Sequence, residues 1–227
     1  KGLGNGFPAS FESGYMLGTM DYENKKFEHD AYRTLDYGFD FYAPQVMECG
    51  TRKILFAWFA IPDSIGKEMK DGWRHLLTLP RELKVSSDHH LLMTPIKELE
   101  KLRTKTLDTT LLNKSWERKV KNQPLELLIT GQYKEDENEK ILELAVKKGS
   151  ITLKQKREEW QQRTCSYQEE NIWKMQIYMD YNTFEVFIND GKYVFSSRIY
   201  PNEVLRFMVD ATSRDKDGKL EMYSLSL

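Results

Sequence analysis

The 227-residue sequence predicts an all-β protein, and three observations support this fold class. Short apolar runs recur along the chain, separated by turn residues at intervals of about 8–12 residues, as in sandwiches, barrels and propellers. Asn189-Asp190-Gly191-Lys192, between two such runs, is the strongest hairpin signal in the chain. Residues 95–103 alone have helical spacing. Two β-rich parts joined by a short helix are therefore expected.

The part before the helix contains a series of predicted strands. Turns are expected at Asn24-Lys25-Lys26 and at Cys49-Gly50-Thr51. Pro80 confines the last strand to a sheet edge or a strand end, because proline donates no hydrogen bond to the ladder. The predicted strands are residues 14–22, 27–29, 41–48, 53–60 and 76–85.

The helical segment is expected to link two domains. Ile96, Leu99 and Leu102 lie three apart, with Pro95 at the first turn and Arg103 at the end. After it the chain becomes β-rich again, and alternation of Trp173, Met175, Ile177 and Met179 indicates an inward-facing row. Alternating strands with polar hairpins favour an antiparallel sandwich. The predicted strands are residues 124–129, 141–146, 173–180, 183–188, 193–200, 205–209 and 220–225.

Composition excludes several classes of function. The formal net charge is -1, which favours neither nucleic acid nor an anionic membrane as a partner. The longest apolar runs are too short to span a bilayer. Cys49 and Cys165 are interpreted as free thiols of a cytoplasmic protein. None of the histidines has a metal-ligand spacing to Cys or to another His, so neither a metal nor a cofactor is expected.

The run from Leu35 to Gln45 combines aromatic residues with Asp36 and Asp40 and ends in Ala43-Pro44-Gln45. Aromatic faces stack on sugar rings, and carboxylates accept hydrogen bonds from sugar hydroxyls. The composition of this run therefore indicates carbohydrate binding.

Four segments, in order, resemble glycoside hydrolase family 32, the β-fructosidases that include invertase and sucrose-6-phosphate hydrolase. Asp40-Phe41-Tyr42-Ala43 resembles the family's Asp-Phe-Tyr-Ala signature. Ile54-Leu55-Phe56-Ala57-Trp58 is similar to its apolar strand ending in Gly-Trp, with Ala57 in place of the Gly. The other two are residues 72–83, with Leu79-Pro80-Arg81-Glu82-Leu83, and residues 180–191, with Glu185-Val186-Phe187.

The resemblance implies the last blades of a five-bladed β-propeller followed by a C-terminal antiparallel β-sandwich. Residues 1–85 would be the C-terminal part of the propeller catalytic domain, residues 86–103 the linker, and residues 104–227 the sandwich. It also implies a retaining glycosidase that cleaves the fructosyl bond of sucrose, sucrose 6-phosphate or other β-fructosides, without a cofactor. Leu35-Asp36-Tyr37-Gly38-Phe39-Asp40 favours the bacterial sucrose-6-phosphate hydrolase type.

The catalytic motifs of the family are not found in this sequence. Its nucleophile lies in Asn-Asp-Pro-Asn-Gly, its stabilising Asp in Arg-Asp-Pro and its acid/base in Glu-Cys-Pro. Glu48-Cys49 is followed by Gly50 and lies on the wrong side of the aromatic signature, and Asn189-Asp190-Gly191 is a hairpin turn. We therefore expect no catalytic residue in the chain, which would lack activity without the missing N-terminal half of the same enzyme.

The resemblance places Tyr42 and Trp58 in the fructose-binding pocket, with Asp40 binding sugar hydroxyls or orienting Tyr42. Packing between blades is the alternative for both aromatic residues, and a backbone N–H partner is the alternative for Asp40. Trp73 and His75 would rim the pocket or be structural. Asp36 is expected to be structural, Arg81-Glu82 to form an ion pair or bridge the domains, and Asp180 and Glu185 to define the fold.

Two other functions stay open. The chain could be a non-catalytic carbohydrate-binding β-sandwich module, which a flat aromatic patch on residues 104–227 would support. It could also be a scaffold, because unpaired blade edges promote self-association.

Overall fold

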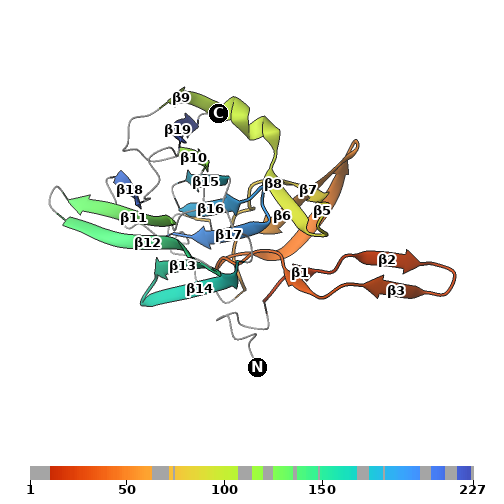
Figure 1. The fold of residues 1–227 in the computed structure, drawn as a ribbon. Helices are drawn as coiled ribbons and strands as arrows, with labels where there is room; N and C mark the ends of the chain where they lie inside the picture. The colour runs from red at the N-terminus through yellow and green to blue at the C-terminus, as the bar shows by residue number, and fades with distance from the viewer. Residues whose placement is uncertain are drawn as a thin grey trace.

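The computed structural model is almost entirely β-structure, which confirms the predicted all-β fold (Figure 1). For residues 104–106, 114–119, 125–134, 137–139, 206–212 and 219–225 only the backbone is described. The described residues are 11–62, 72–73, 75–106, 114–119, 125–134, 137–147, 149–167, 174–180, 182–199, 206–212 and 219–225.

The N-terminal part contains one antiparallel sheet in the order β5-β6-β7-β8, which we call the blade. Positive φ at Gly50 allows the tight turn between β5 and β6, where a turn was predicted. The β2–β3 hairpin projects away from the rest of the chain as an arm (Figure 1). The elements are β1 (Gly14–Tyr15), which pairs with β4 (Arg33–Thr34), β2 (Gly18–Asp21), β3 (Lys26–His29), β5 (Tyr42–Cys49), β6 (Arg52–Trp58), β7 (Arg81–Val85) and β8 (Leu91–Pro95).

Three predicted elements differ from the structure in this part. The strand expected over residues 14–22 is divided into β1, which pairs with β4, and β2, which pairs with β3. The strand expected over residues 76–85 begins only at Arg81, directly after Pro80, and Leu77 makes an isolated bridge with Trp58. The helix expected over residues 95–103 is a 3₁₀ helix, Lys97–Leu102, without a side-chain cap. Because β8 belongs to the blade, the blade sheet continues to Pro95, within the predicted linker. The domain boundaries stay a prediction.

The C-terminal part consists of two antiparallel sheets, as predicted for a sandwich. One has the order β17-β16-β15-β10-β19-β9 and the other β14-β13-β12-β11-β18. Their strands are β9 (Arg103–Thr106), β10 (Lys114–Lys119), β11 (Leu125–Lys134), β12 (Glu137–Lys147), β13 (Ser150–Lys156), β14 (Trp160–Ser166), β15 (Met175–Asp180), β16 (Thr183–Ile188), β17 (Tyr193–Arg198), β18 (Arg206–Thr212) and β19 (Lys219–Leu225).

The predicted hairpin joins β16 to β17 and also contacts the blade. Asn189, Asp190 and Gly191 all have positive φ, as such a turn requires. The Met93 N–H of β8 donates to the Gly191 carbonyl at 3.1 Å. A Cβ at Gly191 would lie 2.0 Å from the Met93 carbonyl oxygen, so only glycine allows this approach.

The sheet β15–β17 is buried on both faces. Met175, Ile177 and Met179 face the sandwich core, as their alternation predicts, while Trp173 lies outside the described residues. Tyr178 on β15 is buried too, in a second core. That core also contains Phe187 and Val194 of the sandwich and Leu35, Phe41, Leu55, Ala57 and Met93 of the N-terminal part. The blade therefore covers the sandwich face that would otherwise meet water.

Candidate functional site

Tyr42 begins β5 and lies opposite Trp58, the last residue of β6. The pairing register shifts between Tyr42 and Gln45, and Ala43 has a φ of 46°. A non-glycine residue in the left-handed region is strained, and bulges of this kind are frequent beside functional sites, where they redirect a side chain. The Ala43-Pro44 bulge thus sets the direction of Tyr42 relative to the rest of β5.

Four rings form what we call the aromatic cluster: Phe11, Tyr42, Trp58 and His75. The Tyr42 and Trp58 ring centroids are 6.2 Å apart. Phe11 meets Tyr42 edge-on at 5.7 Å, and His75 meets Trp58 edge-on at 4.7 Å. Phe11, Tyr42 and Trp58 are half-buried, whereas His75 is exposed. The cluster therefore presents ring surface to solvent.

Backbone hydrogen bonds hold His75 beside Trp58. The Phe59 N–H donates to the Leu76 carbonyl at 2.9 Å, and the Thr78 N–H donates to the Ala57 carbonyl at 2.9 Å. The Ala57 N–H donates to Thr78 Oγ1 at 3.1 Å. This short antiparallel contact brackets Trp58 on both sides.

The polar atoms of the cluster lack partners. Neither the Tyr42 hydroxyl, nor Trp58 Nε1, nor a ring nitrogen of His75 makes a hydrogen bond within the described part of the chain. Aromatic surface with available donors and acceptors is what a sugar ring requires. The cluster can therefore hold a small polyhydroxylated ligand.

A different set of side chains joins the blade to the sandwich, and we call Asp36, Arg81, Glu185 and Ser196 the interface network. Arg81, 0% exposed, donates to Asp36 Oδ2 at 3.0 Å, Glu185 Oε2 at 2.8 Å and Ser196 Oγ at 2.6 Å. Its guanidinium also lies over the rings of Phe41 and Phe187, at 4.9 and 5.2 Å. Arg81 therefore bridges the domains, which is one of the two roles predicted for it.

Each oxygen of the two carboxylates of this network accepts at least one hydrogen bond. Asp36 also accepts the N–H groups of Gly38 and Ser196, at 2.8 and 2.9 Å, and the Ser196 hydroxyl at 2.7 Å. Glu185 Oε1 accepts the Leu79 N–H at 2.8 Å. Desolvation raises the pKa of the Glu185 carboxyl, against the opposing charge of Arg81. The network holds ionised groups in a dry interface because each has a partner.

Asp40 is fully buried and faces the sandwich. Its Oδ2 accepts the Arg198 N–H at 2.7 Å and is paired with Arg157. Its own N–H donates to the Ser196 carbonyl at 3.1 Å. Burial raises the pKa of the Asp40 carboxyl, and the charge of Arg157 opposes that shift. These contacts of Asp40 all reach the sandwich, and they include the backbone N–H partner that was the alternative to sugar binding.

Comparison with known proteins identifies the family. The model of the glycosyl hydrolases family 32 N-terminal domain matches residues 3–95, and that of the family 32 C-terminal domain matches residues 98–224. This chain belongs to glycosyl hydrolases family 32. The four segments that indicated the family from the sequence therefore led to the correct assignment.

Relatives in family 32 are about twice as long as this chain. The sucrose-6-phosphate hydrolase of Staphylococcus xylosus is 31% identical over 88% of this chain and 44% of its own length. The raffinose invertase of Escherichia coli is 32% identical over 84% of this chain and 43% of its own length. The chain spans under half the length of these relatives.

Solved family 32 structures share the fold. The β-fructofuranosidase of Bombyx mori superposes with a TM-score of 0.82 at 25% identity, over 99% of this chain and 49% of that enzyme. The sucrose-6-phosphate hydrolase of Lactobacillus gasseri superposes with a TM-score of 0.73 at 18% identity, over 94% of this chain and 47% of that enzyme.

The residues resembling family 32 catalytic motifs have other surroundings. Glu48 is exposed and paired with Lys53, which lowers the pKa of its carboxyl, the opposite of what a general acid needs. Asp190 lies in the β16–β17 turn and pairs with Lys174 at 3.0 Å. Both fit the structural alternatives that the sequence favoured.

Other predicted residues divide between interface and surface. Glu82 does not pair with Arg81; it pairs with Arg52 at 2.9 Å, because neighbouring strand residues point to opposite faces. Trp73 and His75 were expected to rim the pocket or be structural. Trp73 is 38% exposed and lies under the Arg198 guanidinium at 5.6 Å, whereas His75 contacts Trp58. Arg157 and Arg198 were not predicted, because their partners in the N-terminal part, Asp40 and Phe59, lie more than 100 positions away in sequence.

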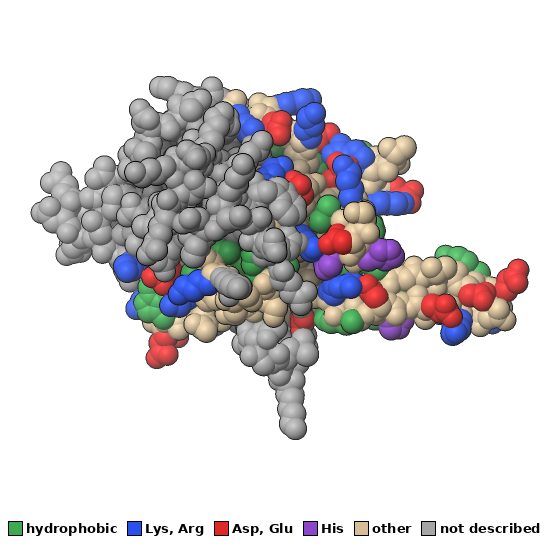
Figure 2. All heavy atoms as spheres, viewed as in Figure 1, with side chains coloured by type: hydrophobic (Ala, Val, Ile, Leu, Met, Phe, Trp, Pro, Cys, Tyr) green, Lys and Arg blue, Asp and Glu red, His purple; other side chains and the backbone are tan. Residues whose placement is uncertain are grey.

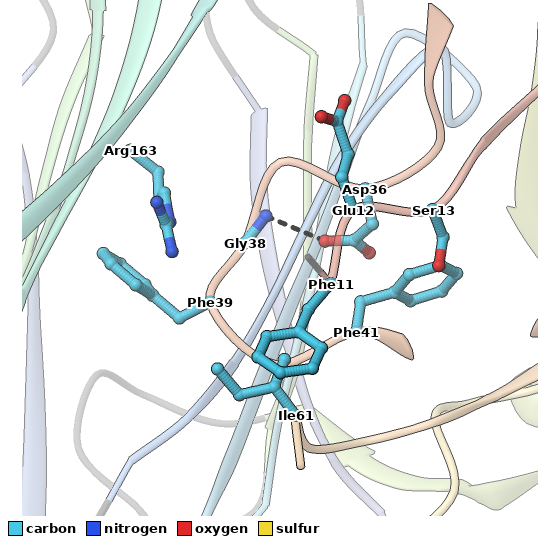
Figure 3. A pocket seen from close by; sticks show the side chains of 9 residues that line it. All are labelled: Phe11, Glu12, Ser13, Asp36, Gly38, Phe39, Phe41, Ile61 and Arg163. Atoms are coloured by element: carbon cyan, nitrogen blue, oxygen red, sulfur yellow. Dashed lines mark hydrogen bonds between the residues drawn. The ribbon is translucent and has the colours of Figure 1, made fainter. Parts of the chain in front are cut away.

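A small cavity lies beside the interface network (Figure 3). Figure 3 shows the bond from the Gly38 N–H to Asp36 between Arg163 on one side and Phe11 and Phe41 on the other. None of Tyr42, Trp58 or His75 lines it. The cavity belongs to the interdomain contact, and it meets the aromatic cluster only through Phe11.

Three further findings concern the described residues alone. No group of three or more His, Cys, Asp or Glu side chains among them is placed to hold a metal ion. No helix within the same ranges has the length and apolarity to cross a membrane. Cys49 is exposed and Cys165 buried, both as free thiols, and burial raises the pKa of Cys165 to about 12.

Proposed function

We propose that this chain forms the C-terminal half of a cytoplasmic β-fructosidase that hydrolyses sucrose, sucrose 6-phosphate or a related β-fructoside. The observation that carries the proposal is the aromatic cluster of a family 32 member, in which Tyr42, Trp58 and His75 carry polar atoms without a partner among the described residues. Tyr42 and Trp58 would contact the fructosyl ring there. The relatives named for sucrose 6-phosphate and raffinose support this substrate class.

The catalytic carboxyl groups would come from residues outside this sequence. A retaining glycosidase needs a nucleophile and an acid/base about 5–5.5 Å apart. Glu48, the one residue here that resembles the acid/base motif, is an exposed ion-pair partner with a lowered pKa. In the proposed enzyme this chain binds and orients the sugar, while the other half supplies the two carboxyl groups.

Exposed apolar residues on the N-terminal part support a second half. β5 is an edge strand of the blade, and Val46 and Met47 on it are 54% and 55% exposed. Met16 and Met20 are also exposed, the latter on the projecting arm. Apolar surface of this kind favours association, which a neighbouring propeller blade would satisfy. Self-association of the isolated chain stays a prediction on the same grounds.

For Asp40 we propose a positioning role rather than sugar binding. Its carboxylate is 0% exposed and engages Arg157 and the Arg198 backbone, both in the sandwich. A carboxylate so placed orders the chain just before Tyr42. The proposed substrate contacts are therefore Tyr42 and Trp58, without Asp40.

The carbohydrate-binding module is the second candidate and has less support. Among the described side chains of residues 140–199, Trp160 is the one aromatic ring counted as exposed, at 44%. A single ring does not make the flat aromatic patch that such a module would need.

The test is hydrolysis of sucrose and of sucrose 6-phosphate by this chain alone and after mixing with an N-terminal half from a family 32 sucrose-6-phosphate hydrolase. We expect no activity alone and activity on mixing, which Trp58→Ala in this chain abolishes and Trp160→Ala does not. Activity of the chain alone would contradict the placement of the carboxyl groups. Sugar binding that depends on Trp160 and not on Trp58 would support the module instead.

A further inference from the structure

We propose that two sandwich residues, Glu185 and Arg198, are positioning residues for the Trp58–His75 half of the aromatic cluster. The inference rests on the proposed function for its kinetic consequence, but its structural part can be tested separately. It assigns the sandwich a role in shaping a sugar site that lies on the blade.

β6 ends at Trp58 and β7 begins at Arg81. We call the described residues between them, 59–62, 72–73 and 75–80, the excursion. His75 lies on it and contacts Trp58 edge-on at 4.7 Å. The position of this ring therefore depends on what holds the two ends of the excursion.

Glu185 holds the returning end. Its Oε1 accepts the Leu79 N–H at 2.8 Å, directly after Thr78, which is bonded to Ala57. Its Oε2 accepts Arg81 Nη2 at 2.8 Å. One buried carboxylate of β16 thus fixes a backbone position four residues after His75 and the first residue of β7.

Arg198 holds the departing end. Its Nη1 donates to the Phe59 carbonyl at 3.4 Å, one residue after Trp58, and its guanidinium lies over the Trp73 ring at 5.6 Å. The side chain is 1% exposed, and its backbone N–H is bonded to Asp40. Arg198, a single residue of β17, thus contacts the excursion at two points. One is Phe59, next to Trp58, and the other is Trp73, two positions before His75.

The contacts of Glu185 and Arg198 explain how the rings are held although their polar atoms have no hydrogen-bond partner among the residues that the structure describes. Rings that bind a sugar must be held by their neighbours, and small displacements weaken both orientation and affinity. Glu185 reaches Leu79 and Arg81, and Arg198 reaches Phe59 and Trp73, so both residues act on the cluster through the excursion.

The first test measures ring position in this chain by NMR. The Trp58 ring shifts the His75 ring-proton resonances, which His75→Gln identifies among the four histidines. Glu185→Gln keeps the shape of the side chain but cannot accept from both Leu79 and Arg81. Arg198→Lys keeps the charge but cannot reach both Phe59 and Trp73. Each is expected to move the His75 signals towards their unstructured positions while the His29 signals stay.

Lys192→Gln is the matched control. Lys192 forms another sandwich–blade ion pair, with Asp88 at 2.6 Å, and neither residue lies on the excursion. This variant should leave the His75 signals unchanged. Unchanged His75 signals in both Glu185→Gln and Arg198→Lys would overturn the proposal, whatever their unfolding midpoints, because a purely stabilising role would leave the ring in place.

The second test uses the mixed enzyme of the preceding section. Glu185→Gln and Arg198→Lys should each raise KM for sucrose about tenfold, the effect of losing one well-placed contact, with a smaller change in kcat. Lys192→Gln should keep the wild-type KM. If the wild-type mixture is inactive, the proposed function fails, while the NMR result still supports or overturns the positioning role. Wild-type KM values in an active mixture would overturn that role in catalysis.

Discussion

The interface network and the aromatic cluster both include residues of the blade, Arg81 in the first and Tyr42 and Trp58 in the second, but they differ in how their polar atoms are bonded. In the network, Arg81 and Asp36 have 0% exposed side chains and are bonded to several partners. In the cluster, Tyr42 and Trp58 are half-buried and leave their polar atoms without a partner in the described chain. Asp36 and Tyr42 are only six positions apart in the sequence.

The difference separates structural from ligand-binding roles better than residue type does. Buried charges are retained only where partners compensate them, so the network holds two domains together. Half-exposed rings with free donors and acceptors contribute little to folding and remain available to a ligand. Changes in the network should therefore alter stability, and changes in the cluster should alter binding.

The largest expected effect is that of Arg81→Met. It leaves Asp36 and Glu185 buried without their cation and should cost about 3–5 kcal/mol of unfolding free energy. Urea unfolding followed by circular dichroism measures it. Arg52→Met, which breaks a partly exposed ion pair with Glu98, should cause a much smaller loss. Equal losses in the two variants would remove the distinction between buried and exposed pairs.

Gly191→Ala should have the next largest effect. The residue has a φ of 76°, and a Cβ would lie 2.0 Å from the Met93 carbonyl oxygen, so strain and overlap together should cost about 2–4 kcal/mol. Gly50→Ala is the control, because Gly50 has a φ of 61° but nothing within 4 Å of its Cβ position. It should cost about 1 kcal/mol, from the backbone alone. Similar midpoints in thermal unfolding would mean that the hairpin does not dock on β8 as tightly as described.

Tyr42→Phe should weaken substrate binding while leaving the stability of the fold nearly unchanged. Removing a hydroxyl without a described partner should change the unfolding free energy by less than about 0.5 kcal/mol. In the mixed enzyme it should raise KM about five- to tenfold, the worth of one neutral hydrogen bond to the sugar. Steady-state kinetics on sucrose give the KM, and thermal unfolding of the same preparation gives the change in stability. A loss of stability with unchanged KM would assign Tyr42 to packing between blades.

The smallest effect concerns the exposed Glu98–Arg52 pair. A hydrogen bond from Arg52 lowers the pKa of Glu98 to about 2, from the ordinary value of 4.5. Because the folded-state value is depressed, the pair contributes stability above pH 4.5 and loses it as pH falls towards 2. Carboxyl carbon NMR of Glu98 against pH measures this, and Arg52→Met should return the midpoint towards 4.5. Buried Glu185 has the opposite pH dependence, because its pKa is raised in the folded state. Its contribution to stability falls as the pH rises above the ordinary pKa of a glutamate.

Local pattern predicted much of the fold but not the long-range partners of Asp40, one of the candidate site residues. The β16–β17 hairpin follows from three residues that tolerate positive φ, and β15 follows from its alternation. β13 and β14 were not predicted, because buried Gln155 and Arg163 interrupt their apolar pattern. Their burial depends on strands and domains distant in the sequence.

The run from Leu35 to Gln45 shows the limit most clearly. Its composition predicts a sugar site, but most of it lies along β17: the Tyr37 N–H donates to the Val194 carbonyl at 2.8 Å and the Asp40 N–H to Ser196. Only Tyr42, at the end of the run, reaches the aromatic cluster. The pairing spans more than 150 residues, so no local pattern could distinguish the residue of the aromatic cluster from those at the interface.

Because the β15–β17 sheet is buried on both faces, the sandwich cannot be separated from the N-terminal part without exposing apolar residues. A sandwich expressed by itself would turn Tyr178, Phe187 and Val194 outward and leave Glu185 facing water without Arg81. Its solubility would then require polar replacements on that sheet. Gene fusions or deletions that separate the two parts would be selected against unless that surface changed with them. The two parts should thus be inherited together, and a natural free-standing relative of this sandwich should carry polar residues at these three positions.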